Sequence, residues 1–107
     1  MRRIDLFGFA DYVAIDPMRK GTVYVQTTCS SGNGMKRVRK IQGLKEVVAK
    51  VLAAGNHVEV WEWNRYSPRG TKKVRVDAKR WVCFLMGGEI DFREVESYQT
   101  LLAKRFS

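Results

Sequence analysis

Apolar residues follow a strand-like period over two neighbouring stretches near the start of the chain. Valine and isoleucine recur at every second position in residues 13–15, and valine does so again in residues 23–25, which is the period of a strand with one buried face. The segment 17–21 between them contains a proline, a basic pair and a glycine, which are typical of a tight turn. Residues 4–28 therefore predict two antiparallel strands joined by a short turn.

The period becomes helical after a loop of small residues at 29–34. Apolar residues then recur every three or four positions, so residues 35–52 predict an amphipathic helix of about 18 residues that stops near Gly55. Gly43 lies inside this pattern, where it either packs closely on the sheet or allows a local kink.

Residues 57–63 are rich in β-branched and aromatic types and predict a third strand. Strand, helix and strand in this order form a crossover unit, so we expect the third strand to lie parallel to the second, with a right-handed connection and the helix on one sheet face. The predicted fold is a single α/β domain with a small mixed β-sheet flanked by helices. His57 is interpreted as a surface residue because no cysteine or serine motif accompanies it.

The second half of the chain begins with a basic run. Residues 65–80 contain seven Lys or Arg and one Asp, and we interpret them as a basic loop with a short edge strand. Residues 81–86 predict a buried strand that ends at two glycines. Asp91 and Glu94 have the spacing of an N-terminal capping pair for a closing helix. The apolar face of that helix would contain Phe92, Val95, Tyr98, Leu101 or Leu102, and Phe106.

Length and composition indicate one folded domain spanning residues 1–107. We divide it into a motif region at 4–64, the basic loop at 65–80, and a C-terminal strand and helix at 81–107. Without a signal-like or membrane-spanning apolar run, the expected location is cytoplasmic. Two cysteines and one histidine are too few for a disulfide framework or a structural zinc site.

The net charge of +9 is the strongest feature of the composition. Residues 89–107 carry three basic and four acidic groups, so residues 1–88 carry a net charge of +10. A concentrated positive charge is typical of proteins that bind nucleic acid. A membrane surface is a weaker alternative because the basic stretches lack the apolar face of an interfacial helix.

Two polar residues interrupt the apolar pattern of the first two strands. Asp11 lies at the head of the first strand and Gln26 lies inside the second. Neighbouring antiparallel strands would bring these oxygen-bearing side chains together, which predicts a metal site. Asp5 is a competing acidic candidate, whereas Asp16, beside a proline, is more simply a turn residue.

Residues 8–11, Gly-Phe-Ala-Asp, and residues 25–28, Val-Gln-Thr-Thr, carry a family resemblance. Together with the strand and turn between them, they resemble the PD-(D/E)xK nuclease superfamily, in particular its small Holliday-junction-resolvase-like and phage-type members. In that family an Asp opens one strand, a Glu (in some branches Gln) and a Lys lie two apart on the next, and a helix follows. The resemblance spans residues 4–64 and implies a restriction-endonuclease-like fold.

The resemblance also implies a function, a cofactor and site residues. It implies a metal-dependent DNA endonuclease, including activity on branched DNA, that uses Mg²⁺ or Mn²⁺. The metal ligands would be Asp11, Gln26 and the carbonyl of Thr27, with Asp5 as a further candidate. Thr28 occupies the lysine position and carries no charge, so a catalytic lysine would come from the following helix. The candidates are Lys36 and Lys40.

The loop before the predicted helix opens onto four cations, and backbone N–H groups at a helix start attract phosphate. Together with the basic run at 65–80, where Tyr66 offers a ring for stacking on a base, this start outlines a surface that follows a phosphate backbone. The expected nucleic-acid-binding residues are Lys36, Arg37, Arg39, Lys40, Arg65, Tyr66, Arg69, Lys72 and Lys73.

Two other functions remain open. Gln26 and Thr28 favour a nucleic-acid-binding module with a degenerate nuclease site over an active enzyme. A structural subunit that binds a partner protein through its basic face is a third interpretation. We also expect a homodimer, because family members usually begin with a helix that this sequence lacks, which would leave sheet surface or a strand edge exposed.

Overall fold

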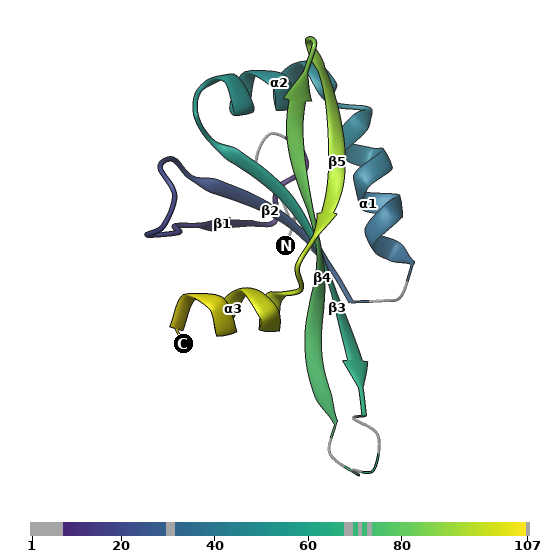
Figure 1. Cartoon of the computed structure of the whole chain (residues 1–107). Coiled ribbons are helices and arrows are strands. Elements are labelled where there is room, and N and C mark those ends of the chain that lie inside the picture. The colour runs from purple at the N-terminus through teal and green to yellow at the C-terminus, as the bar shows by residue number, and fades with distance from the viewer. Residues whose placement is uncertain (1–7, 30–31, 68–69, 71, 73, 107) are drawn as a thin grey trace, which may run out of the picture.

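The five strands of the sheet lie in the same order as they occur in the chain (Figure 1). The computed structural model describes residues 8–29, 32–67, 70, 72 and 74–106. In this part of the chain the elements are β1 (Tyr12–Ala14), β2 (Val23–Thr28), α1 (Asn33–Gln42), α2 (Lys45–Ala53), β3 (His57–Tyr66), β4 (Arg75–Met86), β5 (Glu89–Val95) and α3 (Tyr98–Phe106).

The predicted hairpin and crossover are confirmed. β1 pairs antiparallel with β2, and β3 pairs parallel with β2 through the helical connection. The turn at 17–21 ends at Gly21, whose φ of +88° favours glycine. β1 is shorter than the predicted strand, and residues 4–7 of that prediction lie outside the described residues.

The predicted helix at 35–52 is divided into two helices. Of the two alternatives for Gly43, the structure has the kink and not the close packing on the sheet. α1 ends at Gln42, Gly43 is exposed, and α2 begins at Lys45. The break lets α1 lie over β2 and β3 while α2 lies over β3 and β5. Two shorter helices with different directions therefore cover different parts of the twisted sheet.

The interpretation of 65–80 as a loop with a short edge strand is wrong. β3 continues to Tyr66, and β4 begins at Arg75 and runs between β3 and β5 in the interior of the sheet. Charged residues are compatible with this strand because Arg75 and Lys79 are exposed, whereas the buried Arg80 pairs with Glu59.

The capping pair assigned to Asp91 and Glu94 is also wrong, because both residues lie in β5. The two preceding glycines have φ angles of +59° and +82° and form the tight turn of a hairpin. Ile90 and Phe92 alternate at period two and pack against the core. The closing helix, α3, begins only at Tyr98.

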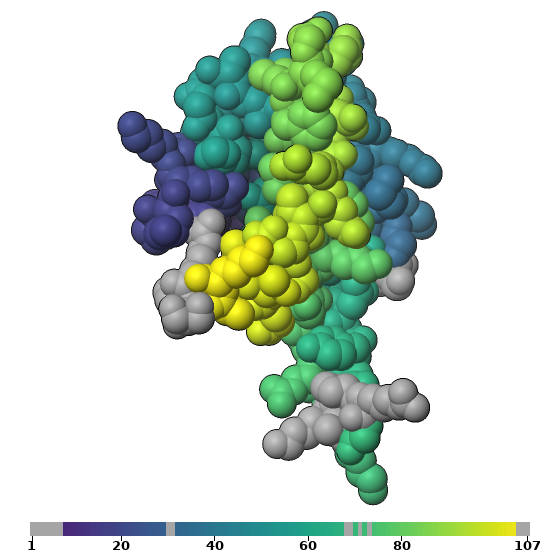
Figure 2. Space-filling view, in the orientation of Figure 1, coloured from purple at the N-terminus to yellow at the C-terminus, as the bar shows by residue number. Residues whose placement is uncertain are grey.

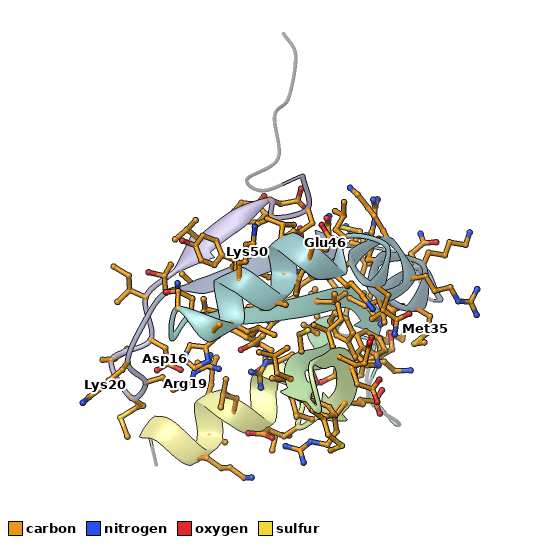
Figure 3. The ribbon with its side chains drawn as sticks, turned by 90° about the horizontal axis from the view of Figure 1, so that it is seen from above. Asp16, Arg19, Lys20, Met35, Glu46 and Lys50 are labelled. Atoms are coloured by element: carbon orange, nitrogen blue, oxygen red, sulfur yellow. The ribbon has the colours of Figure 1, made fainter. Side chains whose placement is uncertain are left out.

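The core lies between the sheet and the helices α1 and α2. The main contributors from α1, α2 and β3 are Val38, Ile41, Val48, Val51, Val58 and Val60, with Phe9, Trp81 and Cys83 beside them. Trp61 alternates with Val60 along β3 and therefore lies on the opposite face. There it contacts Tyr98 of α3, which lies on the other side of the sheet from α2 (Figure 3).

A buried ion pair occupies the face covered by α3. Arg80 Nη2 lies 2.7 Å from Oε1 of Glu59, and both side chains are almost fully buried. Arg19, in the β1–β2 turn, contacts the other carboxylate oxygen at 2.8 Å and also pairs with Asp16 (Figure 3). This cluster ties the β1–β2 hairpin to the centre of the sheet.

Gly34 is the glycine that α1 needs for close packing. A methyl group there would clash with the ring of Trp81 and would lie 3.2 Å from Cβ of Glu62. We expect Gly34→Ala to lower the free energy of unfolding in urea by about 1–3 kcal/mol, as overpacked cores do.

Gly43→Ala is the matched control for this substitution. The added carbon would lie 3.3 Å from the nearest atom, the carbonyl oxygen of Lys40, at an ordinary φ of −70°. It should change the same free energy by less than about 1 kcal/mol. Equal effects of the two substitutions would contradict close packing of α1 at Gly34.

Candidate metal and nucleic-acid site

The hairpin brings Asp11 and Gln26 together, as the sequence predicts. The backbone N–H of Asp11 donates to the carbonyl of Val25 at 2.9 Å, which places Asp11 directly before β1 and opposite β2. Nε2 of Gln26 then donates to Oδ2 of Asp11 at 2.5 Å. Gln26 pairs with Val60 across the parallel strands, so the two polar side chains lie on the sheet face that carries α1 and α2.

Thr27 completes the surroundings of the carboxylate. Its backbone N–H donates to Oδ2 of Asp11 at 3.0 Å, and its hydroxyl lies 3.5 Å from the same oxygen. Its carbonyl oxygen is 3.5 Å from Nε2 of Gln26. Asp11, Gln26 and Thr27 therefore form one polar cluster at the edge of the sheet.

The amide oxygen of Gln26 is the unusual atom of this cluster. The side chain is only 2% exposed, and Oε1 is buried with no hydrogen-bond partner in the described part of the chain. Burial of an unsatisfied acceptor costs about 1–3 kcal/mol. A cation beside Asp11 would satisfy this oxygen after rotation of the amide, which exchanges Oε1 and Nε2.

The donor set of the cluster fits a weakly held divalent cation. Mg²⁺ prefers oxygen ligands, and the cluster offers the Asp11 carboxylate, the Gln26 amide oxygen and the Thr27 carbonyl. It supplies a single negative charge, and the described residues contain no group of three or more His, Cys, Asp or Glu that could hold a metal. Asp5, the other candidate ligand, lies outside the described residues.

Glu62, which the sequence interpretation missed, lies beside this cluster. Thr28 pairs with Glu62 across the parallel strands, and both side chains are buried. The Glu62 carboxylate accepts a hydrogen bond from the backbone N–H of Gly34 at 2.9 Å and another from Asn64 at 2.8 Å. The signal available in the sequence was an acidic residue inside an apolar strand, at a position that does not lead into a turn.

The hydrogen bonds decide the ionisation of Glu62. Burial alone would raise its pKa, but the bonds from Asn64 and from the backbone of Gly34 and Gly32, with the charge of Lys79, hold the pKa below its ordinary value. Glu62 is therefore ionised and accepts a hydrogen bond at the start of α1. The N-cap residue of this helix is Gly32, which has no side chain to make a capping bond.

Six of the predicted nucleic-acid-binding residues lie on two elements, α1 and β3. On α1, Lys36, Arg39 and Lys40 are exposed and Arg37 is half-buried. The first turn of α1 contains no acid. The two lysines proposed as catalytic substitutes for Thr28 are thus on the surface of the helix that Glu62 anchors. On the other element, Arg65 and Tyr66 end β3.

The remaining members of that set are Arg69, Lys72 and Lys73. Lys72 is exposed, whereas Arg69 and Lys73 lie outside the described residues. Cys29 follows β2 directly and is exposed, and Cys83 is buried in the core. Burial raises the pKa of the Cys83 thiol to about 12.

Comparisons of this chain with family models, with curated proteins and with solved structures gave no match. No helix in the described ranges is long and apolar enough to cross a membrane. The residues of the site are therefore the basis for assigning a function.

The lowered pKa of Glu62 predicts a pH-dependent contribution to stability. This contribution is complete above the ordinary pKa of 4.5 and disappears as the pH falls through the lowered pKa of the folded protein. Glu62→Gln should lower the free energy of unfolding by about 1–3 kcal/mol at pH 7, because its hydrogen bonds no longer involve a charged group.

The measurement is a set of urea unfolding curves between pH 7 and pH 3. The difference between the wild type and Glu62→Gln should shrink below pH 4.5. Glu46→Gln, at an exposed position on α2, is the control and should follow the wild type throughout. A difference that stays constant down to pH 3 would contradict an ionised Glu62.

Proposed function

We propose that this chain is a metal-dependent DNA endonuclease of the PD-(D/E)xK type, with a restriction-endonuclease-like core and branched DNA among its substrates. The observation that carries the proposal is the contact of Asp11 with Gln26, whose buried amide oxygen lacks a hydrogen-bond partner within the described ranges. The exposed cations of α1 support the choice of DNA as the substrate.

Each residue has a defined role in this proposal. A bound Mg²⁺ or Mn²⁺ would lower the pKa of a water nucleophile and neutralise charge on the phosphodiester. Asp11 supplies the charged ligand, and the oxygens of Gln26 and Thr27 complete the protein side of the site. Lys36 or Lys40 would orient the scissile phosphate in place of the lysine that Thr28 replaces. The neutral amide makes metal binding weak, so substrate phosphates contribute the remaining ligands.

A non-catalytic nucleic-acid-binding module is the second candidate. The hydrogen bonds from Gln26 and Thr27 satisfy Oδ2 of Asp11 without a metal. The lysine position is occupied by a buried threonine. Such a module would bind DNA through the same cations but would not cut it.

Asp11→Asn separates the two candidates. In a nuclease it removes the charged ligand, so cleavage of linear or branched DNA in Mg²⁺ or Mn²⁺ should fall at least about 100-fold, since the metal contributes several kcal/mol of transition-state stabilisation. DNA affinity should change less than about threefold. Asp91→Asn, at an exposed position on β5, is the control and should leave both properties unchanged.

Gln26→Glu completes this experiment. An added carboxylate beside Asp11 should tighten Mn²⁺ binding, measured calorimetrically, and sustain cleavage at a lower metal concentration. A wild type with no cleavage in either metal, together with a Gln26→Glu variant that binds no metal, would reject the nuclease and leave the binding module.

DNA binding by either candidate should depend on salt. The logarithm of the association constant should fall with the logarithm of salt concentration, with a slope of about −0.9 for each phosphate neutralised. Replacing Lys36 and Arg39 by Glu should weaken binding and make this slope less steep by about 1 for each phosphate that the variant no longer neutralises. Lys50→Glu and Lys104→Glu, on α2 and α3, are the controls. A slope near zero would contradict electrostatic binding.

A further inference from the structure

β3 and β4 extend beyond the rest of the sheet. β2 pairs with β3 only as far as Glu62, and β5 pairs with β4 only as far as Arg80. The pairs from Asn64 to Tyr66 on β3 and from Arg75 to Asp77 on β4 have no further strand beside them in the described chain. We call these six residues the β3–β4 ribbon. It projects from the body of the molecule (Figures 1 and 2).

α3 holds the base of the β3–β4 ribbon in place. The backbone N–H of Gln99 donates to Oδ1 of Asp77 at 2.9 Å, and the Gln99 side chain donates to the carbonyl of Val76 at 3.2 Å. Two-stranded hairpins are only marginally stable by themselves. The ribbon continues two strands of the sheet and makes these two hydrogen bonds with α3. Its direction relative to the sheet is therefore fixed.

The side chains of the β3–β4 ribbon combine cations with exposed apolar groups. Arg65 pairs across the strands with Val76, and Tyr66 pairs with Arg75. Cross-strand partners share one face and successive residues alternate between faces, so each face carries one arginine beside one large apolar or aromatic side chain. Tyr66 is 47% exposed and Val76 is 45% exposed.

An arginine beside an exposed apolar side chain favours contacts with bases over contacts with phosphates alone. Phosphate binding requires only cations, and it gives no reason to expose a valine and a tyrosine far from the core. Base edges in the major groove accept paired hydrogen bonds from arginine at guanine and apolar contacts at the thymine methyl group. A two-stranded ribbon is also of a size that the major groove of B-form DNA admits.

We propose that the β3–β4 ribbon enters the major groove of double-stranded DNA with the face of Tyr66 and Arg75 toward the bases. This face continues the Glu62 side of β3, which carries α1. Arg75 then contacts base edges while the α1 cations bind the phosphate backbone. This inference rests on the proposed DNA-binding function. It adds that the protein contacts a duplex arm of its substrate through the bases. The groove of an RNA duplex is too deep and narrow for the same contact.

The test compares the full-length wild type with Arg75→Ala, and with Arg65→Ala on the opposite face of the ribbon, on a DNA duplex of mixed sequence. Protection of guanine N7 from dimethyl sulfate reports occupation of the major groove, and fluorescence anisotropy reports affinity. The wild type should protect guanines within its binding site. Arg75→Ala should show weaker protection and an affinity reduced about 5- to 150-fold, the range for one paired arginine contact. Arg65→Ala should keep the protection of guanine N7.

Arg93→Ala, at an exposed position on β5, is the matched control and should keep both protection and affinity. Thermal melting checks that every variant is folded. An RNA duplex of the same sequence should bind more weakly than DNA, and Arg75→Ala should not weaken its binding further.

Three results would overturn the inference. The first is DNA binding without protection of guanine N7. The second is a response of Arg75→Ala equal to that of Arg93→Ala. The third is an equal decrease in affinity for DNA and for polyglutamate in Arg75→Ala, which indicates an acidic protein partner. A wild type that binds no DNA at any salt concentration would instead reject the proposed function itself.

Discussion

The hydrogen bond between the Glu62 carboxylate and the backbone N–H of Gly34 determines where α1 begins. Glu62 is held by the parallel pairing of β3 with β2, and the absence of a side chain at Gly34 lets the helix approach Trp81. The start of α1 is thus fixed next to the end of β2. This position sets the cations of α1 on the side of the sheet that carries Asp11 and Gln26.

Two carboxylates on this face consequently have different roles. Glu62 is buried, and its hydrogen-bond donors come from the protein, so it acts on the fold. Asp11 is half-buried at the edge of the sheet, beside an amide that can turn either its nitrogen or its oxygen toward it. This contrast explains why Asp11, and not Glu62, is the candidate metal ligand.

Local geometry made part of this arrangement predictable from the sequence. The period-two pattern and the turn chemistry define the β1–β2 hairpin, and the antiparallel pairing follows, so the contact between Asp11 and Gln26 was predictable. The helical connection also predicted the parallel pairing of β2 with β3. Both results depend on short-range patterns that leave few alternatives.

The remaining features depend on contacts between distant residues. Asp91 and Glu94 have the spacing of a helix cap, but the preceding glycines and the pairing with β4 make them part of a strand. A run of lysine and arginine resembles a loop, although sheet pairing holds much of it in β4. Glu62 could not be recognised as an anchor because its partner Gly34 is 28 positions away in the chain.

The two cysteines differ in a way that has a practical use. Near neutral pH the Cys83 thiol stays protonated in the core, because its pKa is about 12, and it reacts slowly with electrophiles. Cys29 is exposed directly after β2, two residues from Thr27. The native chain therefore carries one accessible thiol at the border of the candidate site, and a fluorophore or cross-linking reagent attached there needs no substitution elsewhere.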